Sequence, residues 1–237
     1  MFKTDLHLHT CLSPCAELEM SPRKIVNRAI ETGMDIIGIC DHNSCENVSA
    51  VRKCAQKTGL TVIRGIEVTS REEVHILALF DDDENMLYMQ KIVYDNLSGE
   101  NNEKLYGEQV VVNEFDEVVE FNRKLLIGAT NLSVDDIVEK IHELNGLAIA
   151  SHIDRQSFSI IGQLGFIPTN VKLDAVEVIA TPKVYEYENL LLPVIISSDA
   201  HRLDEIGQRF TQFYLKEPSF LEIKKSFLGE EGRRVVL

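Results

Sequence analysis

The order of apolar and amphipathic segments predicts an α/β fold with a mostly parallel sheet. Short runs rich in isoleucine, valine and leucine alternate with helical patterns along most of the chain, and strands separated by helices form right-handed βαβ units. Met34–Cys40 is nearly continuously apolar, as expected for a parallel strand that is covered on both faces. About seven such units fit into one domain of 237 residues, which favours a closed or nearly closed barrel over an open sheet.

Helix caps and apolar runs define the first half of the predicted barrel. Ser21-Pro22 is typical of a helix start, and Gly33 and Gly59 follow two predicted helices. The predicted elements are a strand over Lys3–Leu8, a helix from Pro22 to Gly33, a strand over Met34–Cys40, a helix over Asn47–Lys57, and strands over Leu60–Val68 and Val74–Phe80.

The alternation breaks at the acidic run Asp81–Glu84 and resumes at Ser133, which is typical of a helix cap. We therefore expect a single domain over residues 1–237 that carries an inserted subdomain over about residues 81–130. In this insertion the pattern predicts a helix over Met86–Leu97 and a hairpin made of Gln109–Asn113 and Glu117–Phe121. After it we expect a helix from Ser133 to Leu144, strands over Leu147–Ser151, Ala175–Ala180, Val194–Ser197 and Thr211–Leu215, and a closing helix over Pro218–Phe227.

The net charge is strongly negative, because 24 Lys and Arg stand against 38 Asp and Glu, which gives −14. Such a field repels phosphate backbones, so we expect no duplex nucleic acid and no anionic membrane surface among the partners. A small anionic phosphate substrate is compatible with this charge, because bound cations can invert the local field. There is no apolar run of membrane-spanning length and no apolar leader, and the five cysteines are an odd number. We expect a reduced, cytoplasmic protein of undetermined oligomeric state.

Six of the seven histidines lie at or near predicted strand ends. His7 and His9 end the first strand, where side chains two residues apart share a face. The other members of this set are His42, His75, His152 and His201, with the carboxylates Asp41, Glu67 and Asp199. Barrels build their active sites at the carboxyl ends of strands, and imidazole with carboxylate indicates Zn, Mn or Fe. Singly, each residue has an ordinary structural alternative; together they predict a site for more than one metal ion.

These residues resemble the motifs of the PHP family, the polymerase and histidinol phosphatase family of metal-dependent phosphoesterases. The motifs are Asp5-Leu6-His7-Leu8-His9-Thr10, Cys40-Asp41-His42-Asn43, Gly65-Ile66-Glu67-Val68-Thr69, His75, Ser151-His152 and Ser198-Asp199-Ala200-His201. They follow the family order from residue 2 to about residue 210. The resemblance implies a distorted (β/α)7 TIM-like barrel, here with a small insertion, that holds two or three divalent ions.

The resemblance also assigns the ligands. It places one metal on His7, His9, Glu67 and Asp199, a second on Glu67, His75 and His152, and a third on His42 and His201. Family members complete the third site with His or Asp at a position where this chain has Cys15. We therefore expect Cys15, Glu17 or Glu19 to complete that site.

Four further residues have expected roles in catalysis and binding. Asp199 could accept a proton, and Asp41 could orient a histidine from behind. Arg155 and Arg202 follow metal ligands closely, and guanidinium groups bind phosphate bidentately. The alternative for the two arginines is a surface ion pair with a neighbouring aspartate.

The sequence therefore predicts a phosphoesterase that hydrolyses small phosphate esters. The resemblance favours nucleotide-derived substrates, either a nucleoside 3′,5′-bisphosphate or a short oligoribonucleotide. The alternatives are a histidinol-phosphate phosphatase, a regulatory PHP module without turnover, and a hydrolase of C–N bonds. That last class usually relies on a bridging lysine, and no motif of this chain offers one.

Overall fold

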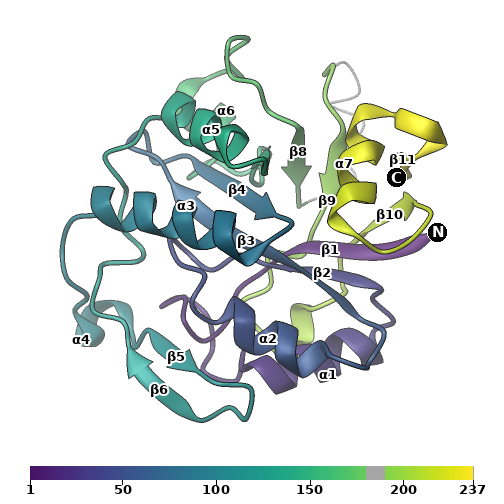
Figure 1. Ribbon diagram of the computed structural model, residues 1–237. Helices are drawn as coiled ribbons and strands as arrows, with labels where there is room; N and C mark the ends of the chain where they lie inside the picture. Colours follow the sequence, from purple (N-terminus) through teal and green to yellow (C-terminus); the bar gives the residue numbers. More distant parts are fainter. Residues whose placement is uncertain (180–189, 237) are drawn as a thin grey trace.

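The computed structural model describes residues 1–179 and 190–236 and has an α/β fold built around one large sheet (Figure 1). Its strands follow the order β11-β10-β1-β2-β3-β4-β7-β8-β9. Their bounds are β1 Phe2–Leu8, β2 Ile36–Ile39, β3 Thr61–Thr69, β4 His75–Phe80, β7 Leu147–Ala150, β8 Ala175–Val178, β9 Val194–Ile196, β10 Thr211–Tyr214 and β11 Arg234–Val236. Of the strand predicted over 175–180, residue 180 lies outside the described residues.

The sheet closes on itself just beyond β9. Ala200 forms a parallel bridge with Leu8 at the end of β1, and the His9 amide donates to the Ala200 carbonyl at 3.0 Å. This contact joins the last barrel strand to the first, so the sheet is a nearly closed barrel. The predicted fold class is confirmed.

One barrel strand runs against its neighbours. The pairs β1–β2, β2–β3, β7–β8 and β8–β9 are parallel, whereas β4 is antiparallel to both β3 and β7. The first residue of β4, His75, therefore lies at the same end of the barrel as the carboxyl ends of the parallel strands. This reversal brings His75 to the site although it begins its strand.

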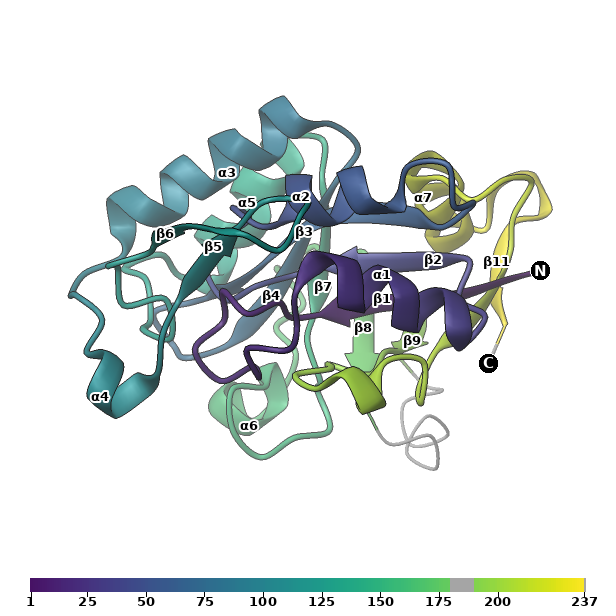
Figure 2. The ribbon, with the colours of Figure 1, turned by 90° about the horizontal axis from the view of Figure 1, so that it is seen from below.

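Helices cover the outside of the sheet (Figures 1 and 2). They are α1 Pro22–Glu31, α2 Val48–Ala55, α3 Asp83–Asn96, α5 Val134–Glu143 and α6 Ile160–Leu164. Helix α7 (Phe220–Leu228) instead packs Phe220 and Ile223 against the apolar side chains of the opposite strand face. In α1 the apolar spacing buries Ile25, Val26 and Ala29, and α5 begins with a capping box of Ser133 and Asp136. The sequence pattern predicts neither α6 nor β11, which span five and three residues. No described helix is both long enough and apolar enough to cross a membrane.

The segment predicted as an insertion consists of two different parts. Helix α3 packs Met86, Met89 and Val93 into the main apolar core. Beyond it, α4 (Glu103–Tyr106) and a separate two-stranded sheet of β5 (Val110–Val112) and β6 (Val118–Phe121) lie away from the barrel, on the side opposite the start of β1 (Figures 1 and 2). The domain boundary at residues 81–130 stays a prediction.

Candidate metal centre

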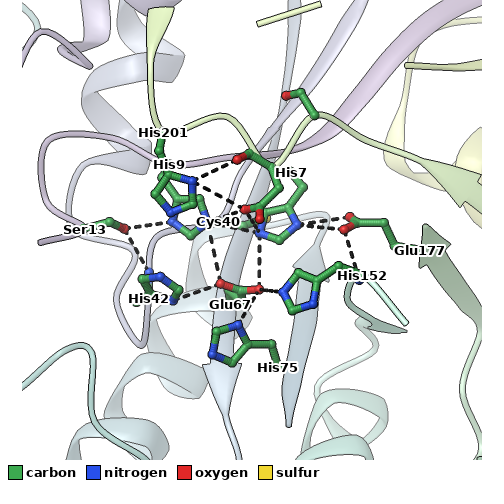
Figure 3. Close-up of polar contacts among 12 residues, drawn as sticks. His7, His9, Ser13, Cys40, His42, Glu67, His75, His152, Glu177 and His201 are labelled. Atoms are coloured by element: carbon green, nitrogen blue, oxygen red, sulfur yellow. Dashed lines mark hydrogen bonds and ion pairs between the residues drawn. The ribbon is translucent and has the colours of Figure 1, made fainter. Parts of the chain in front are cut away.

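The six strand-end histidines converge around Glu67 at one end of the barrel (Figure 3), and Asp199 lies beside His7 and His9. All six histidine rings lie within salt-bridge distance of one of these two carboxylates. His7, His9 and Glu67 are completely buried. Charged and polar groups are rarely buried without partners. The buried ionisable side chains therefore distinguish this end of the barrel from the rest of its interior, which is apolar.

The first group contains His7, His9, Asp199 and one oxygen of Glu67. The Nε2 atoms of His7 and His9 lie 3.1 Å apart, and they lie 3.2 and 3.0 Å from Asp199 Oδ1. His7 Nε2 lies 3.3 Å from Glu67 Oε1. With metal–ligand bonds of about 2.1 Å, ligand atoms around one ion are spaced by about 3.0 Å (octahedral) to 3.4 Å (tetrahedral). The observed spacing therefore fits a shared divalent ion.

Glu67 stands at the centre of the second group, with the rings of His42, His75 and His152 around it (Figure 3). Its Oε1 lies 3.0 Å from His75 Nδ1 and 3.3 Å from His152 Nε2, and its Oε2 lies 2.9 Å from His42 Nδ1. Despite these distances, both Glu67 oxygens and the Nδ1 atoms of His42 and His75 make no hydrogen bond of proper geometry with the described residues. Atoms that are close but not aimed at one another fit ligands that point at a common cation.

The third group contains His9, His42 and His201. The rings of His9 and His201 are stacked with centroids 4.1 Å apart. The Glu17 amide donates to the His201 carbonyl at 2.9 Å, which holds the loop of Cys15 beside this group. His42 reaches both the second and the third group, a double contact that the sequence did not predict.

The Cys15 thiol lies beside His42 and His201 of the third group. Loss of water around the thiol would by itself raise its pKa, but the charges of His42 and His201 and hydrogen bonds with both rings lower it to about 6. Cys15, Glu17 and Glu19 are all exposed, and none of them belongs to the ligand groups of the described residues. The Glu17 carboxylate instead faces Arg202 at 3.5 Å. The structure therefore brings only Cys15 of these three candidates to the histidines.

A buried carboxylate behind His7 was missed by the sequence analysis. Both oxygens of Glu177 lie 3.0–3.1 Å from His7 Nδ1, so Nδ1 donates to Glu177 and Nε2 is left to face the metal groups. Burial alone would lower the pKa of His7, but Glu177, Asp199 and Glu67 raise it well above its ordinary value. The available signal was a single charge in the apolar run Ala175–Val178.

His9 is oriented through a hydroxyl group. Its Nδ1 lies 2.9 Å from Ser13 Oγ, and Ser13 Oγ donates to Asp41 Oδ1 at 2.7 Å. Asp41 also accepts from the amide and the hydroxyl of Thr10, both at 2.7 Å. The structure therefore places Asp41 behind His9 rather than among the ligand atoms, and Ser13 is a contributor that was not predicted.

Two of the ligands have unusual backbone conformations. His152 has φ of 31° and Asp199 has φ of 51°, in the left-handed region that non-glycine residues rarely adopt. The His152 amide donates to Glu177 Oε1 at 3.2 Å, and the amide after Asp199 donates to the His7 carbonyl at 3.3 Å. Strained residues that are held in place in this way are common at functional sites.

The two predicted phosphate-binding arginines lie in different surroundings. Arg155 Nη1 lies 2.7 Å from Asp199 Oδ2, and the Arg155 side chain is about half exposed. Arg202 pairs with Glu17 and Asp204 at the rim, at 3.5 and 3.3 Å. Arg155 therefore reaches the ligand cluster directly, whereas Arg202 forms the surface ion pair that was its alternative.

Fold and site together define the class of the protein: a barrel-shaped α/β protein with clustered metal-binding side chains at one end. The chain belongs to the PHP domain family, which matches residues 5–167, so the resemblance seen in the motifs is confirmed.

Three known proteins resemble this chain in sequence or in fold. A 5′-3′ exoribonuclease from Haemophilus influenzae is 30% identical over 80 residues, which are 32% of this chain and 28% of that protein. Endonuclease Q from Pyrococcus furiosus shares the fold with a TM-score of 0.74 at 20% identity, over 100% of this chain and 58% of the endonuclease. A protein from Bifidobacterium adolescentis described as a metal-dependent phosphoesterase has a TM-score of 0.54 at 17% identity, over 84% of this chain and 87% of its own. This chain thus spans little more than half of endonuclease Q, and its match covers about a quarter of the exoribonuclease.

One prediction about partners is wrong. A structure of endonuclease Q, again with a TM-score of 0.74, holds a 27-mer duplex with an abasic lesion at the active site. A protein of this fold therefore binds duplex nucleic acid. The net charge of −14 is a sum over the whole chain, whereas binding depends on the local potential, which cations and arginines can invert. The charge does not exclude a duplex partner.

Proposed function

We propose that this chain hydrolyses phosphoester bonds in nucleotide-derived substrates, such as a nucleoside 3′,5′-bisphosphate or a short oligoribonucleotide. The observation that carries the proposal is Glu67, a buried carboxylate whose two oxygens face histidines without a proper hydrogen bond. The 30% identity to an exoribonuclease over 80 residues supports the substrate class.

Two or three divalent ions fit the side chains present. His7, His9, Glu67 and Asp199 would hold the first, Glu67, His75 and His152 the second, and His42, His201 and Cys15 the third. Bound ions of this kind lower the pKa of a coordinated water and neutralise charge on phosphoryl oxygens. Zn, Mn and Fe all suit such ligands.

The chain's own residues set the geometry of the site. Glu177 fixes the tautomer of His7, and the Ser13–Asp41 pair fixes that of His9. Burial would raise the pKa of Asp199, but His7 and His9 hold it well below its usual range. Asp199 is therefore ionised and suited to bind a cation. The Asp199→Asn variant tests its predicted role as a proton acceptor.

Arg155 is the candidate for binding a second phosphate. Its guanidinium lies beside the carboxylate of Asp199. The Arg155 side chain is about half exposed, so it can also contact a bound solute. Loss of a bidentate arginine–phosphate contact costs about 1.5–3 kcal/mol, or roughly a tenfold to hundredfold effect on kcat/KM.

The test is reconstitution followed by substrate profiling. Protein freed of metal by chelation is loaded with Zn²⁺, Mn²⁺ or Fe²⁺, its metal content is measured, and it is assayed on a bisphosphate nucleotide, the matching monophosphate, an oligoribonucleotide, duplex DNA and histidinol phosphate. We expect two to three ions per chain and the highest kcat/KM on the bisphosphate or the oligoribonucleotide, with Arg155→Ala impairing the bisphosphate most. Fewer than one ion per chain, or a preference for histidinol phosphate, overturns the proposal.

A further inference from the structure

An aromatic ring lies at the edge of the metal-binding cluster without belonging to the apolar core. Phe158 follows β7 and stacks on the imidazole of His75, with centroids 4.8 Å apart and planes inclined by 23°. It is 39% exposed. It is not among the buried residues that form the four apolar clusters of the described chain. Burial of the ring in a core therefore does not explain its position.

The backbone holds this ring in place at some cost. Phe158 has φ of 59°, which is a genuine outlier for a bulky side chain. Its carbonyl accepts a hydrogen bond from the His75 amide at 2.9 Å, and the next residue, Ser159, donates through Oγ to the Arg155 carbonyl at 2.6 Å. Strain that neighbouring contacts maintain is typical of functional positions.

The same loop places a cation on the other side of the cluster. Arg155 Nη1 lies at Asp199, whereas the Phe158 ring lies on His75. One short segment thus offers a guanidinium and a flat apolar ring beside the groups that would bind the reacting phosphate. A solute that matches both features has a phosphate and a planar aromatic ring a few ångströms from it, as a nucleotide does.

We propose that Phe158 is a specificity residue that stacks on the nucleobase next to the phosphate being cleaved. The proposal rests on the proposed function and adds to it the part of the substrate that this position recognises. Stacking on an aromatic side chain tolerates any base, because every base has a π-face. Phe158 would therefore select nucleotides over other phosphate esters without selecting one base.

The test compares two substrates that differ only in the base. Metal-loaded protein is assayed on adenosine 3′,5′-bisphosphate and on the abasic ribose bisphosphate, with Phe158→Leu, Phe158→Trp and the control Phe166→Leu, which alters another exposed phenylalanine (64% exposed). We expect Phe158→Leu to lower kcat/KM on the nucleotide tenfold to hundredfold, mainly through KM, and to change the abasic reaction less than twofold. Phe158→Trp keeps the aromatic face and should retain most of the nucleotide activity, and Phe166→Leu should match the wild type.

Metal content and binding distinguish stacking on the base from a purely structural role of the ring. Equal losses of kcat/KM on both substrates, or loss of bound metal in Phe158→Leu, would show that the ring only positions His75. No loss of kcat/KM on either substrate would show that the ring has no role. Each of these results overturns the inference. If the wild type cleaves neither substrate, the proposed function fails. Equilibrium binding of the same two bisphosphates, measured by calorimetry, then decides the stacking by itself: tighter binding of the nucleotide that Phe158→Leu abolishes supports it, and equal binding overturns it.

Discussion

The ligand end of the barrel and the β5–β6 hairpin place their side chains in opposite ways. At the barrel end, histidines and carboxylates are buried, and several of their atoms make no hydrogen bond with the described residues. On the hairpin, Phe115, Val118 and Val119 are apolar and more than half exposed. Buried polar atoms without partners are costly, whereas exposed apolar groups are common on protein surfaces. The contrast indicates that the barrel end is organised around a ligand, while the hairpin surface carries no comparable constraint.

Replacement of Glu67 should give the largest effect and is the sharpest test of this contrast. Glu67→Ala removes the carboxylate that lies within salt-bridge distance of five of the histidines. We expect kcat/KM to fall by at least a hundredfold to a thousandfold, as when one preorganised electrostatic group is lost, and bound metal to decrease. Cys15→Ala, which removes a thiol that contacts only His42 and His201 among the histidines, should lose less. Steady-state kinetics with elemental analysis measure both, and the reverse order would refute the ligand assignment.

The central part of this site could be predicted because motif positions follow strand ends. His7 and His9 share a strand face by simple alternation, and the order of motifs identified the family. Glu177 was missed because one charge inside an apolar run has no neighbouring polar pattern to mark it. Whether Arg155 or Arg202 reaches the cluster depends on loop paths that local sequence does not encode. The duplex prediction failed because a net charge contains no information on where the charges lie.

Asn47 is one of the residues that join the two regions, and its replacement should have the next largest effect. Its Nδ2 donates to Thr10 Oγ1 at 2.9 Å and to the Val110 carbonyl at 3.0 Å, and its Oδ1 accepts from the Val112 amide at 2.9 Å. Asn47→Ala removes these three hydrogen bonds between buried groups, so we expect a loss of about 2–3 kcal/mol in the free energy of unfolding. Urea denaturation measures the loss, and hydrogen exchange should show the hairpin amides opening first. An unchanged midpoint would mean that the hairpin is attached by other contacts.

Replacement of Glu177 tests whether the buried carboxylate behind His7 contributes to metal binding, as the ligands themselves do. Glu177→Gln keeps the shape of the side chain but weakens the contact with His7 Nδ1. Loss of such a partner lowers metal affinity by about tenfold to hundredfold. We expect competition with a chelator to show this decrease in affinity, with the fold intact by circular dichroism. Unchanged affinity would mean that Glu177 serves only the backbone of His152, to which it also bonds.

The smallest effect is expected on the hairpin surface, and it tests the other side of the comparison. Val119 is 64% exposed on β6, and threonine is β-branched like valine, so Val119→Thr keeps the strand preference while making the surface polar. Because surface substitutions away from special features usually change stability by less than about 0.5 kcal/mol, we expect an unchanged urea midpoint, metal content and kcat/KM on a bisphosphate nucleotide. A selective loss on an oligoribonucleotide would show instead that the hairpin contacts longer substrates. Such a result would break the contrast between the two regions, because the exposed apolar face would then be part of the substrate-binding surface.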